Sequence, residues 1–310
     1  MLFPLMGSSV TSSRRNLAEF EHSEWQGRTD GTPWMQRMLI ALIRVLPLWL
    51  MYGVMGLVIP FYMLFGGGFR PSYAFFRKRI GYGPLKSFLH VYSNEFGFGM
   101  VVLDRFAVYA GKKFKVDEYR KDIFDRLEKE DGGFMMLSSH TGCFEMAGYM
   151  FTSKVKKVHA LVYPGESGTI AANRGRVFSS TNVEMVPVQP DLSHVFTLNN
   201  ALADGQIVTM PGDRVYGSGK TVRAEFFGAP ASFPAGPFTL AAQRNVPVIS
   251  VFVMKDGYRR YRVYIEELTI DREAPRAEQV AAMAQAYASR MESIVREYPD
   301  QWYNFFDFWK

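Results

Sequence analysis

The sequence predicts an α/β fold with one mixed, largely parallel sheet that helices cover, preceded by an N-terminal membrane-associated helical segment. From residue 134 onward, short apolar runs alternate with amphipathic stretches, which is the pattern of strands joined by helices. Of the 310 residues, 48% are hydrophobic, which is enough for a large core. An uncharged apolar stretch at 45–65 stands before this region. We therefore expect a polar segment at 1–33, a membrane anchor with a basic juxtamembrane region at 34–85, and a folded domain at 86–310.

The stretch from Val45 to Phe65 is the expected anchor. Its 21 residues carry no charge, and a bilayer-spanning helix needs about 20 apolar residues. Pro47 and Pro60 favour breaks near the ends of such a helix. The segment is expected to be a transmembrane helix or a monotopic or re-entrant anchor, with a buried core helix as the alternative.

The net charge of +6 is concentrated near this anchor. Residues 1–90 contain ten Lys and Arg against four Asp and Glu, whereas the rest of the chain contains 26 of each. A local basic excess beside an apolar segment indicates a membrane surface rather than a nucleic-acid partner, and it favours the cytoplasmic side. The residues expected at that surface are Arg70, Arg77, Lys78 and Arg79.

The domain at 86–310 contains alternating helices and strands. Helices are expected at residues 86–110, 117–129, 167–179, 191–203, 235–244 and 275–297, with one more ending at 151. Strands are expected at residues 134–137, 157–163, 183–188, 206–210, 223–227, 246–253 and 260–265. Asp256-Gly257 is the turn signal for a hairpin between the last two strands.

His140 is followed five residues later by Glu145, at the point where the first of these strands gives way to a helix. Catalytic groups gather at that end of the strands in open α/β sheets. Glu145 is expected to accept the Nδ1 proton of His140, which leaves Nε2 as a general base. Thr141 and Gly142 would supply backbone N–H groups for an oxyanion. From the spacing alone, a capping threonine beside an incidental histidine is an open alternative.

Other motifs in the chain indicate no second chemistry. Cys143 is the only cysteine, which excludes an intrachain disulfide and a multi-cysteine zinc site, and we interpret it as a packing residue rather than a nucleophile. His159 and His194 complete no metal-ligand spacing, so no metal is expected. Gly217-Ser218-Gly219-Lys220-Thr221 ends like a phosphate-binding loop, but Arg214 stands where that motif requires glycine.

The His140 segment, Ser-Ser-His-Thr-Gly-Cys-Phe-Glu, resembles the His-x-x-x-x-Asp/Glu motif of the glycerolipid and lysophospholipid acyltransferase superfamily. Glu in the last place is similar to the bacterial lipid A late acyltransferase branch. Further blocks resemble that family in the same order: 211–217, 226–228 with 236–241, 246–249, and the closing Pro299-Asp300-Gln301-Trp302-Tyr303. The resemblance covers residues 25–310, about the whole chain.

The resemblance also implies further site residues. Family members carry an arginine between the histidine motif and the Asp block, and Arg174 and Arg176 share that assignment here, for a substrate phosphate. Asp213 is implied to bind substrate or to orient a group of the site. Arg214, also a substrate-binding candidate, stands where relatives often have Gln or His. Solvated helix arginines and a turn aspartate are the alternatives.

Taken as a whole, the resemblance implies a membrane-associated O-acyltransferase. It would move a fatty acyl chain from an acyl-carrier-protein or coenzyme A thioester to a lipid acceptor, with His140 as general base and no cofactor. The resemblance places such a catalytic domain on the cytoplasmic face of a bacterial inner membrane. The acceptor, the chain length and the oligomeric state stay open. Two alternatives are a lipid or thioester hydrolase that uses the same His/Glu pair, and a non-catalytic membrane-associated module.

Overall fold

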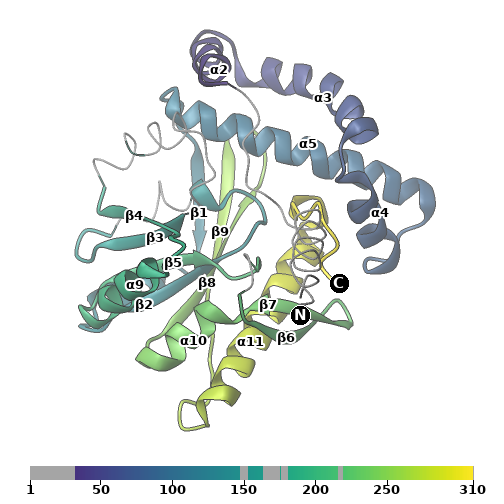
Figure 1. Ribbon diagram of the computed structural model, residues 1–310. Helices are drawn as coiled ribbons and strands as arrows, with labels where there is room; N and C mark the ends of the chain where they lie inside the picture. Colours follow the sequence, from purple (N-terminus) through teal and green to yellow (C-terminus); the bar gives the residue numbers. More distant parts are fainter. Residues whose placement is uncertain (1–31, 147–152, 163–174, 176–180, 216–218, 310) are drawn as a thin grey trace, which may run out of the picture.

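The computed structural model describes residues 32–146, 153–162, 175, 181–215 and 219–309. Among them, a seven-stranded sheet in the order β1-β9-β8-β2-β5-β3-β4 forms the centre of the molecule, with helices around it (Figure 1). Its strands are β1 (Lys115–Tyr119), β2 (Phe134–Ser138), β3 (Val158–Val162), β4 (Val183–Pro187), β5 (Ile207–Pro211), β8 (Val248–Lys255) and β9 (Arg260–Glu267).

The strands of this sheet pair parallel with their neighbours, except for β8 and β9. Those two form the antiparallel hairpin that the Asp256-Gly257 turn predicts. The expectation of a mixed, largely parallel α/β sheet is therefore confirmed. Two further strands, β6 (Thr221–Phe226) and β7 (Ala229–Pro234), form a separate antiparallel ribbon, of which only the first strand was expected.

One expected helix begins later than predicted. Residues 117–129 were expected to be helical throughout, but Lys115–Tyr119 pair with β9 as the edge strand β1, and the helix begins at Lys121. The sequence of β1, Lys-Val-Asp-Glu-Tyr, has no apolar run, because an edge strand is partly solvated on both faces. Its polar character is typical of a strand that limits further edge-to-edge pairing.

The helices lie close to their expected positions, except those at 33–45 and 69–78, which were not predicted. They are α2 (Pro33–Val45), α3 (Leu48–Phe65), α4 (Phe69–Lys78), α5 (Pro84–Tyr109), α6 (Lys121–Lys129), α9 (Ser193–Ala203), α10 (Ala235–Arg244) and α11 (Arg276–Glu297), followed by the 3-10 turn η1 (Pro299–Gln301). The helix expected at 167–179 and most of the one ending at 151 lie outside the described residues.

Two hydrophobic cores lie on opposite faces of the sheet. In β2, which is buried along its whole length, Met135 and Leu137 pack with residues of α9, α10 and α11. Phe134 and Met136 point the other way and pack with α6. This alternation is that of a central strand with both faces covered. The central position of β2 fixes the place of the residues that follow it.

The expected anchor at 45–65 corresponds to one helix, α3, which α2 precedes and α4 follows. Residues Leu46 and Pro47 are extended and separate α2 from α3, whereas Pro60 lies inside α3 without ending it. Both helices lie along α5, at the top of the view in Figure 1. Within the described residues, no helix has the length and apolar character needed to cross a bilayer, so the expected transmembrane helix is not confirmed.

A buried carboxylate joins these helices to the sheet. Asp104 of α5 is 0% exposed, and it accepts hydrogen bonds from the hydroxyl groups of Tyr52 on α3 and Tyr261 on β9. Its second partner on the sheet is Lys255, whose Nζ lies 2.5 Å from Oδ2 of Asp104. A buried charge pair of this kind is stable only while both members are present, because either charge alone is strongly disfavoured in a dry interior.

Asp104→Ala should therefore lower the free energy of unfolding by about 3–5 kcal/mol, since it leaves the Lys255 ammonium group buried without its carboxylate. Urea unfolding followed by circular dichroism measures this change. The double variant Asp104→Leu/Lys255→Met should recover most of the loss, because no charge then remains buried. A single-variant loss below about 1 kcal/mol would contradict a structural role for the pair.

Candidate active site

The candidate site lies where two neighbouring strands end. Strands β2 and β5 pair in parallel, with Ser138 opposite Pro211. His140 and Asp213 each lie two residues beyond this last pair, so the register of the sheet brings them to the same place. The carbonyl oxygen of Ser138 is held from two sides, by the N–H of Gly212 at 2.8 Å and by the hydroxyl of Tyr287 at 2.6 Å.

Asp213 binds both the ring and the backbone of His140. Oδ1 of Asp213 lies 2.8 Å from Nδ1 of His140, and Oδ2 accepts a hydrogen bond of 2.8 Å from the His140 backbone N–H. This contact fixes the tautomer in which Nδ1 carries the proton and Nε2 carries the lone pair. The His140 side chain is 12% exposed, so the ring can still be reached from one side.

The expected contact between Glu145 and Nδ1 of His140 is wrong, because Asp213 is the partner of that atom. Oε1 of Glu145 instead accepts a hydrogen bond of 2.9 Å from Arg105 on α5. The two side chains form an ion pair that is largely buried, with side-chain exposures of 15% and 10%. Glu145, five residues after His140, therefore connects the segment that follows the histidine to α5 through Arg105.

The backbone after His140 is held between the sheet and the C-terminal segment. The N–H of Gly142 donates to the carbonyl oxygen of Gln301 at 2.8 Å, and the N–H of Cys143 donates to that of Val253 at 2.7 Å. Gly142 has a φ of +52°, and a Cβ atom there would lie 2.1 Å from the Val253 oxygen. Only glycine fits this position.

These bonds correct the expected oxyanion site. Gly142 cannot offer its N–H to an oxyanion, because Gln301 already accepts that hydrogen bond. Thr141 is 1% exposed, and its hydroxyl lies 2.6 Å from that of Ser139. Thr141 and Gly142 were expected to begin a helix and to offer their backbone N–H groups to substrate. In the structure, Thr141 instead forms a β-bridge with Trp302.

The surroundings of the ring, above all its burial, lower the pKa of His140. Burial lowers the pKa of His140, the nearby guanidinium of Arg214 lowers it further, and Asp213 opposes both. Burial by itself raises the pKa of Asp213, but His140 and Arg214 together hold it below its ordinary value. Arg214 is fixed beside the ring by a hydrogen bond of 2.9 Å from Nη2 to the carbonyl oxygen of Tyr303. Near neutral pH the site therefore holds a neutral imidazole next to a carboxylate and a guanidinium.

The structure also places the remaining candidates. Cys143 is 3% exposed in the core, and burial raises the pKa of its thiol, which agrees with its interpretation as a packing residue. His159 lies on β3, 3.4 Å from a carboxylate oxygen of Glu184. In the parts of the chain that the structure describes, no group of side chains has the arrangement of a metal site. Arg174 and Arg176 lie outside the described residues.

Sequence reasoning missed two residues of this region. Arg105 and Asn94 lie on α5, and the long helical pattern gave no reason to single out either polar residue. Asn94 is 1% exposed. A buried polar residue in an amphipathic helix is the signal that could have found it, but its burial becomes visible only once the packing of α5 is known.

A protein-family model for bacterial lipid A biosynthesis acyltransferases matches residues 98–310, which contain His140, Asp213 and Arg214. The chain belongs to this family. It is accordingly an acyltransferase, and the resemblance seen in the sequence is confirmed. Membership of this family favours acyl transfer over the two alternatives, a hydrolase and a non-catalytic module.

Other comparisons add less. No curated protein matches the chain. Among solved structures, the chain is similar to the 1-acyl-sn-glycerophosphate (LPA) acyltransferase, PlsC, from Thermotoga maritima. The two share 13% sequence identity, the match covers 83% of this chain and 100% of that chain, and the TM-score is 0.39.

Proposed function

We propose that this acyltransferase moves a fatty acyl chain from an acyl-carrier-protein or coenzyme A thioester to a hydroxyl group of a lipid, with His140 as the general base. The observation that supports the proposal is the contact between His140 Nδ1 and Asp213 at 2.8 Å, on a ring that is still partly exposed. A histidine held in this way presents Nε2 as a proton acceptor. No cofactor or metal takes part in the proposed reaction.

The proposed reaction is a direct transfer. Nε2 of His140 accepts the proton of the lipid hydroxyl while the hydroxyl oxygen attacks the thioester carbonyl carbon. The tetrahedral intermediate collapses with cleavage of the C–S bond, and the thiolate leaves and takes up the proton from the imidazolium. Asp213 stabilises the imidazolium during this cycle, and positioned general-base catalysis of this kind contributes about 10²–10⁴-fold.

Glu145 has a different role in this proposal from the one its spacing suggests. Its ion pair with Arg105 ties the residues after His140 to α5, so it supports the site rather than the ring itself. Arg214 is the described cation that lies beside the ring, and we propose it as the group that faces the developing oxyanion. Arg174 and Arg176 remain candidates for a phosphate of the donor or acceptor.

His140→Ala should lower kcat by about 10²–10⁴-fold, because it removes the base. Asp213→Asn should also lower kcat strongly, since the amide cannot stabilise the imidazolium. The assay follows thiol release from lauroyl-coenzyme A or lauroyl-acyl carrier protein, with and without a lipid A precursor, and separates acyl lipid from free fatty acid by mass spectrometry. A His140→Ala enzyme within a few-fold of wild type would overturn the proposal.

Glu145→Gln is the matched comparison for Asp213→Asn, because both changes convert a buried carboxylate into an amide of the same size. The structure predicts the larger loss of kcat for Asp213→Asn. If Glu145→Gln were the more damaging variant and Asp213→Asn nearly neutral, Glu145 would be the partner of the histidine during catalysis.

The pH profile tests the electrostatics of the base. Because His140 must be neutral, kcat/KM should fall as the pH drops through its pKa, which lies below the ordinary value of about 6.5. Arg214→Met removes a cation that disfavours the imidazolium, so it should move this acidic limb to higher pH. Arg214→Lys keeps the charge and should leave the limb nearly in place. An unchanged limb in Arg214→Met would show that Arg214 does not act on the ring.

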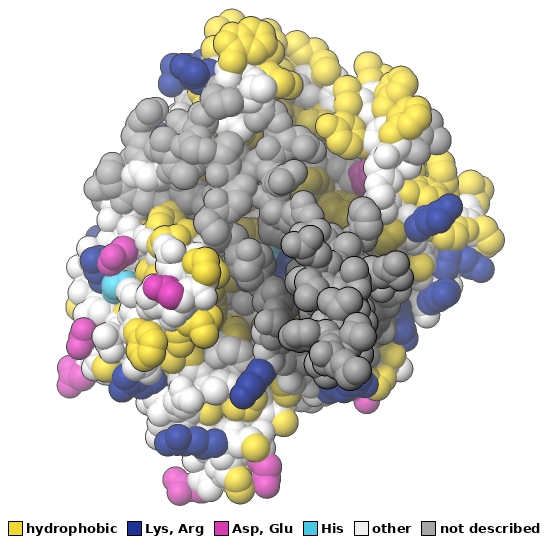
Figure 2. Space-filling model, in the orientation of Figure 1, with side chains coloured by type: hydrophobic (Ala, Val, Ile, Leu, Met, Phe, Trp, Pro, Cys, Tyr) yellow, Lys and Arg dark blue, Asp and Glu magenta, His cyan; other side chains and the backbone are white. Residues whose placement is uncertain are grey.

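We also propose that α2 and α3 lie on a membrane surface. Large apolar side chains on their outer face are solvent-exposed, including Trp49 at 62%, Leu57 at 75% and Phe61 at 63%. Figure 2 shows hydrophobic side chains gathered over these helices at the top and Lys and Arg side chains at the right, over α4. Such a continuous apolar face is rare on a soluble surface and suits the interface of a bilayer.

The basic residues expected at that surface lie on or just after α4. Arg70, Arg77 and Lys78 are exposed, but the guanidinium of Arg77 donates a hydrogen bond to the carbonyl oxygen of Tyr82. Arg79 stacks on Trp309, with the guanidinium carbon 4.4 Å from the ring centroid. Arg70 and Lys78 are therefore the two best placed to meet anionic headgroups. The cytoplasmic face of a bacterial inner membrane, which provides thioester donors and such headgroups, is the proposed location.

Trp49→Glu/Phe61→Glu should reduce binding to phosphatidylglycerol vesicles by at least about tenfold, because each change places a charge in the apolar face. Vesicle co-sedimentation measures the binding. Phe196→Glu is the control, since Phe196 is 69% exposed but lies on α9. Equal binding by the double variant and the control would contradict this membrane face.

A further inference from the structure

Asn94 of α5 makes two hydrogen bonds to the segment that follows α11. Its Nδ2 donates to the carbonyl oxygen of Asp300 at 3.0 Å and to that of Trp302 at 2.9 Å. These two carbonyl groups flank Gln301. Asn94 is 1% exposed, and in the described part of the chain its own Oδ1 is buried with no hydrogen-bond partner. A buried, half-satisfied amide is uncommon and indicates that its donor side serves a specific purpose.

The segment held by Asn94 in turn holds the backbone around His140. The carbonyl oxygen of Gln301 accepts the N–H of Gly142 at 2.8 Å, and the N–H of Tyr303 donates to the carbonyl oxygen of His140 at 3.0 Å. The peptide groups of His140 are thus held at both ends, by Asp213 at the N–H and by Tyr303 at the C=O.

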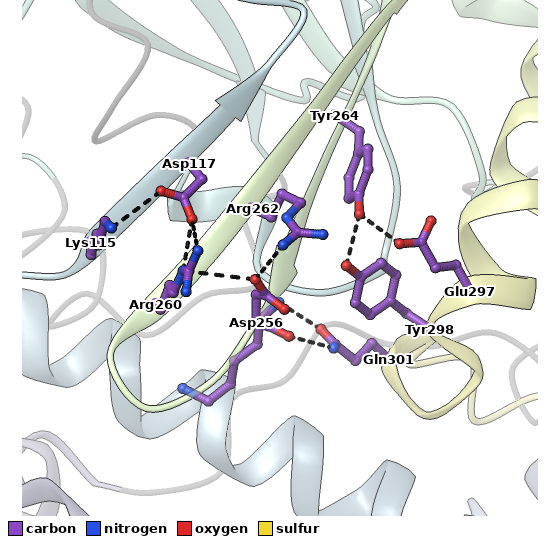
Figure 3. A network of polar contacts seen from close by, with 10 residues as sticks. Lys115, Asp117, Asp256, Arg260, Arg262, Tyr264, Glu297, Tyr298 and Gln301 are labelled. Carbon is purple, nitrogen blue, oxygen red and sulfur yellow. Dashed lines mark hydrogen bonds and ion pairs between the residues drawn. The ribbon is translucent and has the colours of Figure 1, made fainter.

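The side chain of Gln301 fixes the same segment to the sheet. Its Oε1 accepts the N–H of Lys255, its Nε2 donates to the Lys255 carbonyl oxygen, and both distances are 2.8 Å. Figure 3 shows this amide reaching the end of β8, beside the charged residues of the β8–β9 hairpin. The residues 300–303 therefore form a clamp that is attached to α5 through Asn94 and His90, to β8 through Gln301, and to the His140 loop.

We propose that Asn94 is a positioning residue for the general base, acting through the clamp at 300–303. This inference rests on the proposed role of His140. Without the two bonds from Asn94, the carbonyl groups of Asp300 and Trp302 lose their buried donor, and the segment that holds the His140 loop is less firmly fixed to α5. A displacement of about 1 Å in a catalytic group lowers the rate by about 10²-fold.

Asn94→Ala should therefore lower kcat by about 10–100-fold with KM for donor and acceptor changed by less than about threefold. The substrates are the thioester and lipid pair used for His140→Ala. Amide hydrogen exchange read by mass spectrometry gives a second measurement that needs no substrate. In Asn94→Ala the N–H groups of Gly142 and Cys143 should exchange faster than in the wild type. Asn94→Ser, which keeps one short donor, should show the same two effects to a smaller extent if the Ala variant folds poorly.

Gln279→Ala is the matched control. Gln279 is 8% exposed, and its Nε2 also donates to two carbonyl groups, those of Arg272 and Ala274, both at 2.8 Å. These bonds lie at the start of α11 and make no contact with the clamp. The control should lose similar stability in urea while kcat and the exchange of residues 140–143 stay within about twofold of the wild type.

The outcomes separate the two proposals. If His140→Ala is inactive but Asn94→Ala matches Gln279→Ala in kcat and in exchange, Asn94 is only a stability residue and the positioning role is overturned. If His140→Ala stays active, the proposed base fails, whatever the Asn94 variants do. Faster exchange at 140–143 together with lower kcat in Asn94→Ala and Asn94→Ser, but not in Gln279→Ala, is the result that supports the inference.

Discussion

The carboxylate of Asp213 is the point on which the site depends. It accepts one hydrogen bond from the ring of His140 and one from its backbone, so it sets the position and the tautomer of the base together. Both bonds require β2 and β5 to be neighbours in register, and they require a backbone without a side chain at Gly212, where a Cβ would lie 2.9 Å from the Tyr287 ring. The contact between Asp213 and His140 therefore depends on the parallel pairing of β2 and β5, on Gly212 and on the buried ring of Tyr287.

Much of the fold could be predicted from the sequence, because helices and buried strands have strong local patterns. The expected hairpin and the central apolar strands are confirmed, whereas the polar edge strand β1 was missed, since its pairing with β9 has no local signal. For the site, the sequence indicated His140 and Asp213 but joined His140 to the wrong carboxylate. Glu145 is near in sequence, while Asp213 is 73 residues away and reaches the ring through the strand order. The hydrogen bond between Gly142 and Gln301 likewise joins residues that are far apart in the sequence.

Helix α5 connects the outer helices to the reaction centre. Along one helix, Asn94 holds the C-terminal clamp, Asp104 binds Lys255 at the end of β8, and Arg105 binds Glu145. The same helix packs on α3 and α4, and Asp104 also accepts a hydrogen bond from Tyr52 of α3. The segment that follows β2, with His140 and Glu145, is therefore supported by a helix that lies outside the sheet. The match to the family model begins at residue 98, within this same helix.

The contact between Tyr52 and Asp104 has a practical consequence for anyone preparing the enzyme. Proteins are often shortened for preparation, and the exposed apolar side chains of α2 and α3 invite such a cut. Here the cut would remove a hydroxyl group that Asp104 uses in the interior, and it would uncover the face of α5 that α3 packs against. A preparation that keeps α2 and α3 is therefore the better route to an active sample.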